Sequence, residues 1–506
     1  MNRKIGVILS YVLMVFEVLS TLLLTPFIIR TLGQAEYGVY KLAFAINAYL
    51  LLLDLGIGNA IVRYIAKYKS EGNVKKERQF FSVAIVFYLI IALIAIIAGI
   101  VLVFIFPSVF SKGLNQEEIR LGQILLGITM VNSAITLGTA PYNNVLIAYE
   151  KFAVSRSASI VQIIFRMILT YVVLKLGWGS IGIVCVNLLM TILCRAYFAV
   201  FVFAKIKLKP LFKNIELSFI KEIVVYSSLI LLQMVATQLN SSVDQILIGS
   251  LVKSSAVILA VYSVGTQIVQ YFQSIGNAFT NVLMPGVVRL VGTNATSKSL
   301  TDEMIRIGRI IFMALSVIYV GFIVCGREFI VLWAGNDNTN AYYVTVILMS
   351  AYIIILTESI GSQILWALNE HKEQSFMKIA VVLLNILLTA FLIKWNPLIG
   401  ATIGTFISLF LGDVVVLTII LKKKLKINLK DYFFGLIKGI LPCVIISGLC
   451  GVVINQFLPQ GWLWLLIKIA VIVTAYIVMM FVFGMNKYEK NLILSMLKKV
   501  KNNGGK

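Results

Sequence analysis

The sequence predicts an all-α polytopic membrane protein with about 14 transmembrane helices, built as two parallel six-helix lobes plus two extra C-terminal helices. Hydrophobic residues make up 60% of the 506, charged residues only 13%, and the mean hydropathy is +0.97. A span needs ~20 apolar residues to cross ~30 Å of hydrocarbon. Every backbone polar group in lipid must be paired within its own segment, so we expect each span to be a helix.

The apolar stretches follow one another from the N-terminus, with little sequence left for a soluble domain. The first is too long for a signal peptide and no small-residue cleavage site follows it, so we expect a helix of the mature protein. The predicted spans are 6–29, 38–62, 80–106, 122–148, 158–176, 179–204, 223–250, 256–284, 307–333, 342–368, 376–394, 397–421, 434–457 and 462–484.

The basic residues give the predicted orientation. If loops are assigned to alternate sides, one side receives 32 of the 44 Lys and Arg and the other receives six. An excess of Lys and Arg marks cytoplasmic loops, so both termini are expected in the cytoplasm. The net charge of +23 therefore reflects membrane topology and does not indicate nucleic-acid binding.

An internal repeat suggests how the spans are grouped. Ile57-Gly-Asn-Ala60 recurs as Ile275-Gly-Asn-Ala278, and weaker matches continue at a nearly constant offset of 218–219 residues. A six-span unit is even, so both copies enter the membrane in the same direction, as in transporters built from parallel repeats. The predicted parts are an N-terminal lobe (1–204), a basic cytoplasmic linker (205–222), a C-terminal lobe (223–421), two extra helices (422–484) and a basic amphipathic tail (485–506).

The composition argues against several functions. The five cysteines all fall in apolar spans, without a CxxC pair, and His371 is the only histidine. These residues give little material for a metal site or a catalytic triad, so we expect no metal and no catalytic residues. No GxxxxGK[ST] phosphate-binding loop occurs. Active transport would therefore use an ion gradient or the membrane potential, with Na⁺ or H⁺ as coupling ion and no other cofactor.

Charged residues inside the spans are the candidate functional residues, because an ionisable group in hydrocarbon costs ~2.5–3.5 kcal/mol even on insertion scales. Tyr40, Asn47 and Asp54 are seven residues apart and should form one polar stripe. Tyr40 and Asn47, with Lys41, are candidates for substrate contact. The candidate ion-coupling residues are Glu17, Asp54, Asp244 and Glu358, and the candidate structural ion pairs involve Arg166, Arg195 and Asp413.

Structural explanations compete with these roles. Arg30, Lys41 and Arg63 lie where a long side chain can extend to the lipid headgroups. Glu17 or Asp54 could instead form a static ion pair with Arg166 or Arg195, which would fix the packing of the lobe.

The first 64 residues resemble the start of bacterial polysaccharide repeat-unit flippases of the O-antigen and capsule type. The match consists of Thr25-Pro-Phe-Ile-Ile-Arg-Thr-Leu-Gly33, Glu36-Tyr-Gly38 and Leu53-Asp-Leu-Gly-Ile-Gly-Asn-Ala-Ile-Val-Arg-Tyr64. These flippases belong to the multidrug/oligosaccharidyl-lipid/polysaccharide exporter superfamily. The span number and the six-plus-six repeat agree with this family over the whole chain.

The resemblance implies a function and a set of site residues. The substrate would be a polyprenyl-pyrophosphate-linked oligosaccharide, moved from the inner to the outer leaflet of the bacterial cytoplasmic membrane by alternating access. Arg30 and Glu36 match residues that face the cavity in related lipid II flippases, and Arg63 is the nearest candidate for a further arginine. The arginine of the eighth helix in those relatives has no counterpart, which favours a polysaccharide substrate over lipid II.

Two other functions remain as alternatives. A multidrug/cation antiporter of the same superfamily would need an anionic cavity, and Arg30 and Lys41 argue against one. A membrane-embedded polysaccharide polymerase would need a large hydrophilic loop with catalytic carboxylates, whereas the outer loop at 107–121 has only Glu117 and Glu118. The expected partners of a flippase are membrane lipids, a polysaccharide polymerase and glycosyltransferases, and no nucleic acid.

Overall fold

The computed structural model describes residues 2–54, 56–213, 219, 234–235, 238–240, 242–291, 296–368, 370, 372–491 and 494–495. All regular secondary structure in these residues is helical, which confirms the predicted fold class. Within them, 12 helical segments are long and apolar enough to cross a membrane. The predicted first and second spans form one of these segments. Half of the predicted span 223–250 lies outside the described residues, as does His371.

The chain divides into two compact units, Met1–Ser263 and Val264–Lys506. The division lies inside α9 (Ser255–Val291), further along the chain than the predicted linker 205–222. Two contacts explain why the start of α9 belongs to the first unit. Ser255 donates a backbone hydrogen bond of 2.8 Å to the carbonyl of Gly113, and Gly38 lies so close to Ala256 that a Cβ on Gly38 would clash with the Ala256 carbonyl.

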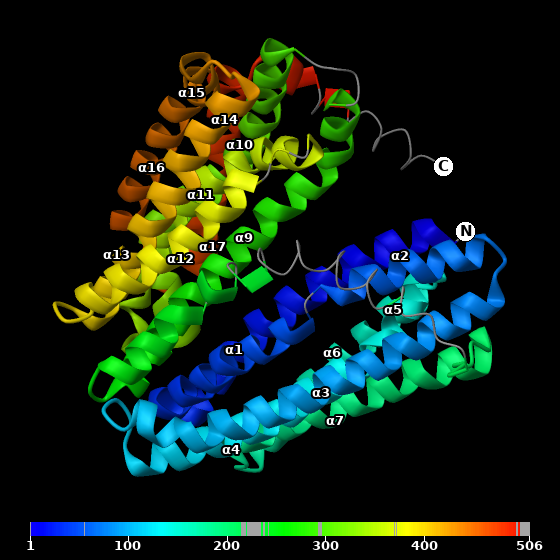
Figure 1. Cartoon of the computed structure of the whole chain (residues 1–506). Coiled ribbons are helices and arrows are strands. Elements are labelled where there is room, and N and C mark those ends of the chain that lie inside the picture. The colour runs from blue at the N-terminus through cyan, green and yellow to red at the C-terminus, as the bar shows by residue number, and fades with distance from the viewer. Residues whose placement is uncertain are drawn as a thin grey trace. The chain divides into compact units, whose positions relative to one another are not determined.

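The first unit is a bundle of long helices. In it α1 packs against α4 and α6, α3 packs against α4, and α7 packs against both α4 and α6; α3, α4 and α7 run side by side in Figure 1. Its helices before α9 are α1 (Asn2–Leu51), the 3₁₀ turn η1 (Leu52–Asp54), α2 (Ile57–Ser70), α3 (Val74–Phe110), α4 (Gln116–Gly138), α5 (Ala140–Ala148), α6 (Phe152–Lys175), α7 (Gly179–Phe201) and the π-helical turn η2 (Val202–Ile206).

A bend at Gly33 divides α1 into two parts that correspond to the first two predicted spans. Gly33 has φ 77° and ψ 171°. That is a left-handed, non-helical conformation that a residue with a side chain rarely adopts. The second part ends in the turn η1, and Gly56, with φ 72°, then starts α2 in a new direction. This change of direction turns the end of the predicted span 38–62 toward α3 and α5.

Polar residues in the connections begin several helices. Asn115 and Glu118 form a reciprocal capping box at the start of α4, with both hydrogen bonds at 2.9 Å. The side chain of Asn73 accepts a hydrogen bond from the backbone N–H of Lys76 at the start of α3. These contacts satisfy donors that a helix N-terminus leaves unpaired, so the sequence itself specifies where the chain turns.

The second unit is built around the 38-residue helix α10 (Ser297–Ala334), which packs against α11, α15, α16 and α17. A second group consists of α12, α13 and the π-helical turn η4. The other elements after α9 are η3 (Asn336–Asn338), α11 (Ala341–Ala367), α12 (Lys372–Leu392), α13 (Pro397–Leu409), η4 (Phe410–Val416), α14 (Leu417–Leu425), α15 (Leu429–Ile437), α16 (Ile440–Phe457), α17 (Trp462–Met479) and η5 (Met480–Gly484).

Two buried ion pairs attach the last helices to α10. Near one end of α10, Lys468 of α17 donates to a carboxylate oxygen of Glu328 at 2.7 Å, and the other oxygen accepts from the Gly461 N–H at 2.9 Å. Near its other end, Arg309 pairs with Glu489, which follows η5. The two helices predicted in 422–484 lie outside the sequence repeat. In the second unit, α17 and the chain after η5 form buried polar contacts with α10.

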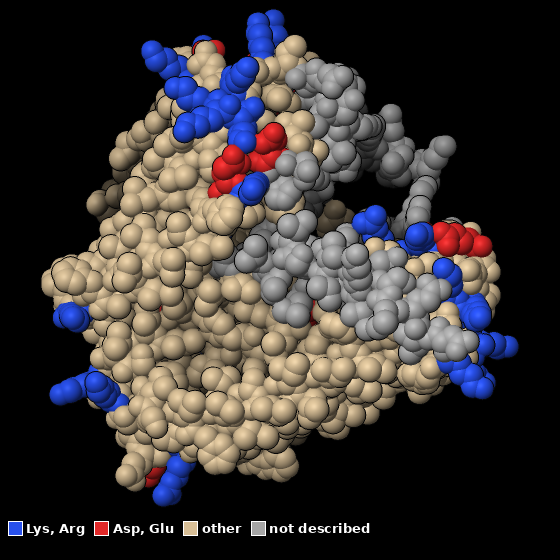
Figure 2. Space-filling view, in the orientation of Figure 1, with Lys and Arg blue, Asp and Glu red and all other residues tan. Residues whose placement is uncertain are grey.

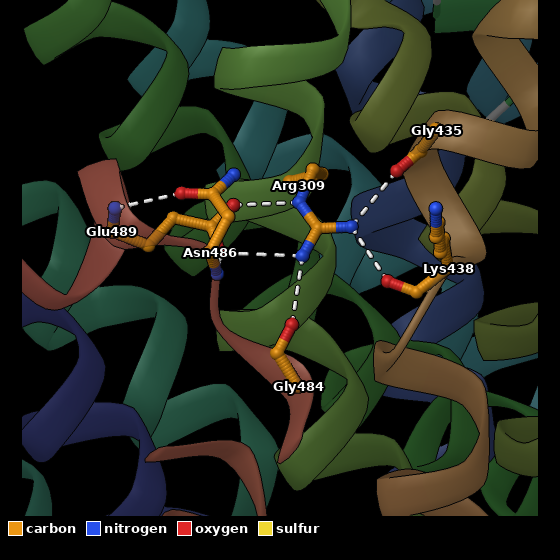
Figure 3. A network of polar contacts seen from close by, with 6 residues as sticks. All are labelled: Arg309, Gly435, Lys438, Gly484, Asn486 and Glu489. Carbon is orange, nitrogen blue, oxygen red and sulfur yellow. Dashed lines mark hydrogen bonds and ion pairs between the residues drawn. The ribbon is translucent and has the colours of Figure 1, made fainter. Parts of the chain in front are cut away.

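All five N–H donors of Arg309 have partners (Figure 3). Nε and Nη2 donate to the Glu489 carboxylate at 2.6 and 3.2 Å, Nη1 donates to the carbonyls of Gly435 and Lys438, and Nη2 also donates to the Gly484 carbonyl. Arg309 is 5% exposed and Glu489 is 2% exposed. Complete pairing of this kind is what makes a buried charge tolerable.

The surface agrees with a multi-pass membrane protein. In Figure 2 the charged side chains gather near the ends of helices, and broad uncharged areas separate them. Many large apolar side chains are exposed, for example Phe104, Leu387 and Leu463. Such surface is costly in water and is stable against lipid hydrocarbon.

Candidate functional site

The first unit contains a small cavity that brings two basic side chains together within the apolar spans. We call it the Arg166 cavity. Its volume is about 190 Å³. It is lined from both parts of α1 and from α6 and α7, by Ser20, Thr21, Leu24, Thr25, Ile28, Tyr37, Tyr40, Lys41, Phe44, Arg166, Thr170, Ile183 and Asn187.

The charge of this cavity is positive. Lys41 and Arg166 are the ionisable bases among the described residues that line it, and none of those residues carries a carboxylate. The Lys41 ammonium lies 5.3 Å from the centre of the Tyr37 ring, within the range of a cation–π contact. Thr25, Tyr40 and Asn187 add hydroxyl and amide groups to the lining of the same cavity. Such a cavity suits an anion that can also accept and donate hydrogen bonds.

The bend in α1 produces this arrangement. Thr25 and Ile28 come from the part before Gly33, and Tyr37, Tyr40 and Lys41 come from the part after it. Tyr40 and Lys41 are residues that the sequence predicts for substrate contact, whereas Arg166 is predicted for a structural ion pair. The two parts of α1 and the middle of α6 become neighbours through the packing of α1 against α6, which the sequence alone does not indicate.

A second, larger cavity lies at the other end of the same unit, where α1 turns into α2. We call it the Arg195 cavity. Its volume is about 550 Å³. It is lined from the end of α1 and from η1, α2, α4, α5 and α7, by Leu51, Asp54, Gly58, Asn59, Val62, Arg63, Thr136, Leu137, Ala140, Asn143, Asn144, Ile147 and Arg195.

Asp54 in this cavity has a hydrogen-bond partner from α3. Tyr88, which is fully buried, donates to the Asp54 carboxylate at 2.5 Å. Arg63 lines the same cavity and also lies beside the Tyr64 ring. The sequence placed Asp54 and Arg195 in the same lobe, and the structure brings them to one cavity.

Neither Arg166 nor Arg195 forms an ion pair with any carboxylate in the described part of the chain, contrary to the prediction for these two residues. The reason is geometric: Arg166 and Asp54 line different cavities, and Asp54 is bonded to Tyr88. The third predicted structural residue, Asp413 of η4, does form an ion pair, with Lys378 of α12.

Other predicted substrate residues lie away from the Arg166 cavity. Arg30 is exposed and lines neither cavity. Glu36 accepts a hydrogen bond of 2.6 Å from the backbone N–H of Ser180, in the first turn of α7. Asn47 is buried and accepts from the Ser133 hydroxyl of α4 at 3.0 Å. The contacts of Glu36 and Asn47 hold helices together. The three residues of the predicted stripe have different surroundings: Tyr40 lines the Arg166 cavity, Asn47 is bonded to α4, and Asp54 lines the Arg195 cavity.

The remaining predicted coupling residues also differ in their surroundings. Glu17 is exposed on the first part of α1. Asp244 is buried and accepts a hydrogen bond of 2.5 Å from the Tyr262 hydroxyl, within the first unit. Glu358, in the second unit, is 1% exposed and its oxygens both lie 3.4 Å from the Thr418 hydroxyl.

The amides of the Arg195 cavity are not among the residues predicted from the sequence. Asn143 and Asn144 interrupt an otherwise apolar predicted span, and this polar pair was a usable signal. Asn59 belongs to a repeated sequence that we interpreted only as evidence of duplication. The described residues form no group of three or more His, Cys, Asp and Glu side chains suited to a metal ion.

Two further cavities are apolar. One, of about 500 Å³, lies between α6 and α7 of the first unit and includes Phe165, Leu193 and Tyr197. The other, of about 320 Å³, lies in the second unit among α9, α10, α11 and α17 and includes Phe272, Phe329 and Ile472.

The fold has known relatives among solved structures. The structure of the lipid II flippase MurJ in an inward closed conformation is similar over 96% of this chain and 99% of that chain, with TM-score 0.73 and 18% identity. An inward-facing multidrug resistance MATE family transporter of the MOP superfamily is similar over 80% of this chain and 96% of that chain, with TM-score 0.64 and 16% identity. No curated protein sequence shows significant similarity.

The comparison with protein-family models identifies the family of this chain. The family model described as "Polysaccharide biosynthesis protein" matches residues 4–291, more than half of the sequence and nearly all of the first unit. This match confirms the resemblance to the polysaccharide family, and the likeness to the solved structures confirms the fold. The chain belongs to the polysaccharide biosynthesis protein family.

Proposed function

We propose that the protein moves a polyprenyl-pyrophosphate-linked oligosaccharide from the inner to the outer leaflet of the bacterial cytoplasmic membrane, with both termini in the cytoplasm. The observation that carries this proposal is the Arg166 cavity, which Lys41 and Arg166 line together with hydroxyl and amide groups, and whose described lining residues include no carboxylate. A pyrophosphate would bring negative charge to these two cations, and arginine can bind two of its oxygens at once.

The cost of an unpaired cation within the membrane favours an anionic ligand. A cation within the apolar spans is costly unless it is paired, and Arg166 has no acidic partner in the described residues. A bound oxyanion would provide that partner during transport. The two apolar cavities of the units offer surfaces against which a polyprenyl chain can pack.

An exporter of cationic compounds is the alternative that the MATE fold suggests. Such a substrate needs a carboxylate or several aromatic faces in its site. The Arg166 cavity has aromatic residues, but its two cations would repel a cationic ligand. We therefore favour a lipid-linked pyrophosphate over a cation as the substrate.

An ion gradient or the membrane potential is the proposed driving force, with Na⁺ or H⁺ as the coupling ion. Asp54 and Asp244 are the best supported coupling residues, because each is a carboxylate in a span with a tyrosine hydroxyl as its partner. Glu17 and Glu358 remain further candidates. A glycosyltransferase would supply the substrate and a polysaccharide polymerase would use the product.

An export measurement tests the proposal in cells whose surface polysaccharide depends on this protein. Arg166→Gln and Lys41→Gln should each reduce surface polysaccharide by about tenfold or more, while Lys41→Arg should retain most of it. Lys175→Gln is the matched control, because Lys175 is an exposed cation on the same helix α6. Normal export by Arg166→Gln at a normal membrane level of protein would contradict the proposal.

A further inference from the structure

The Arg195 cavity holds a positive charge that no protein group in the described residues neutralises. Arg195 lies on α7 within an apolar span, and its side chain is partly buried. Its guanidinium lies 5.9 Å from the centre of the Phe198 ring. The described ion pairs do not include it. A charge in this position is costly without a partner, which indicates a ligand.

The one carboxylate of the cavity is already engaged. Asp54 accepts the hydrogen bond from Tyr88 at 2.5 Å and is farther than ion-pair distance from Arg195. Arg63 contributes a second guanidinium to the lining. Among the described residues that line the cavity, the unpaired base is Arg195, so an added negative charge would neutralise it.

Amide groups line the rest of the polar wall. Asn143 accepts a hydrogen bond of 2.8 Å from the Ser155 hydroxyl through its oxygen, so its NH₂ group can donate to a ligand. Asn59 and Asn144 line the same cavity, and Thr136 adds a hydroxyl. Amides both donate and accept, which is what a ligand with several hydroxyl groups requires.

We propose that the Arg195 cavity is a second substrate site, which binds an oxyanion with hydroxyl groups beside it. In the proposed transport reaction, on which this inference rests, the oxyanion is either the pyrophosphate or the carboxylate of an acidic sugar, and the hydroxyls belong to the glycan. Arg195 binds the oxyanion, and Asn59, Asn143 and Asn144 bind the hydroxyls. A volume of about 550 Å³ is within the usual range of small-molecule sites.

The two cationic cavities lie along one helix. Lys41 lines the first and Leu51, the last residue of α1, lines the second; 10 residues at ~1.5 Å each separate them by about 15 Å along the axis of α1. That distance is a large part of the ~30 Å hydrocarbon thickness. We expect the substrate oxyanion to occupy the Arg195 cavity and the Arg166 cavity in turn, so that a charged group is never left without a partner in the membrane.

Binding measurements with the full-length protein in lipid nanodiscs test this site. The probes are polyprenyl pyrophosphate without sugar, the same lipid carrying a neutral disaccharide, and the same lipid carrying a disaccharide with a uronic acid. Arg195→Gln should raise Kd about tenfold or more, because it removes a charged hydrogen-bond donor. Arg195→Lys should raise it less, and Arg120→Gln, an exposed arginine on α4, should leave it unchanged.

The pattern across probes identifies the oxyanion. Weaker binding of all three lipids by Arg195→Gln assigns the pyrophosphate to this cavity, and weaker binding of the uronic acid lipid alone assigns the sugar carboxylate. Unchanged binding of all three, with Arg166→Gln impaired, overturns this inference and leaves the proposed function intact. If the parent protein binds none of them, the proposed function itself fails.

Discussion

Tyr88 of α3 donates a hydrogen bond of 2.5 Å to Asp54, which ends the turn that follows α1. The two residues are 34 positions apart, and both lie within the predicted spans. A carboxylate paired with a neutral hydroxyl keeps its ability to gain or lose a proton, whereas one paired with arginine is held in its charged form. This contact is the reason to regard Asp54 as a coupling residue and not as part of a static ion pair.

We predict that Asp54→Asn removes the dependence of transport on the ion gradient, because the amide cannot exchange a proton or bind a cation by charge. Tyr88→Phe should weaken that dependence without abolishing transport, since the carboxylate remains. Transport by reconstituted protein is measured with and without an imposed Na⁺ or H⁺ gradient. Glu117→Gln, an exposed acid on α4, is the control.

A charge exchange separates the two explanations for Asp54. The double variant Asp54→Arg with Arg166→Asp should stay inactive, because the two residues line different cavities. If the double variant transports more than either single variant, Asp54 and Arg166 form a direct ion pair, and Asp54 is not the coupling residue.

The pair of Arg309 and Glu489 is predicted to stabilise the second unit. Glu489→Gln leaves the buried guanidinium without its carboxylate, at a cost of about 3 kcal/mol or more, and should lower the Tm in detergent. Lys487→Gln, two residues away and exposed, should leave it unchanged. An equal Tm for Glu489→Gln and the parent protein would show that Glu489 does not hold the chain after η5 on α10.

The predicted orientation can be tested at loops that carry basic residues. Single cysteines at Lys69, Lys209 and Lys423 in a cysteine-free variant should resist an impermeant thiol reagent in intact cells and react after permeabilisation. A cysteine at Lys112, in the loop before α4, should react in intact cells. Reaction at the first three positions in intact cells would reverse the assigned topology.

Local patterns in the sequence were sufficient for much of the fold. Apolar length identified the membrane helices, and the motif around Arg30 and Glu36 identified the family, which the family model confirms over residues 4–291. The bend at Gly33 separates the first two predicted spans, as their hydropathy suggested. These features depend on neighbouring residues and so can be read from one sequence.

Contacts between distant segments could not be predicted in the same way. Arg309, near the start of the predicted span 307–333, meets Glu489, 180 positions later, in a buried pair that the sequence does not indicate. Arg166 and Arg195 were expected to bind carboxylates, and the packing of α6 and α7 instead places each in a cavity. Which side chain an arginine meets depends on helix packing, and periodicity alone does not determine that.

The most direct test of the proposed function is a flipping measurement in proteoliposomes with a fluorescent polyprenyl-pyrophosphate disaccharide in the outer leaflet and an imposed ion gradient. The loss of label accessibility to an impermeant quencher reports movement between leaflets. We predict that the parent protein and Lys175→Gln move the lipid, and that the double variant Lys41→Gln with Arg166→Gln does not. Equal rates for the double variant and the parent, or movement of a cationic dye in place of the lipid, would contradict the assignment of the Arg166 cavity to the substrate pyrophosphate.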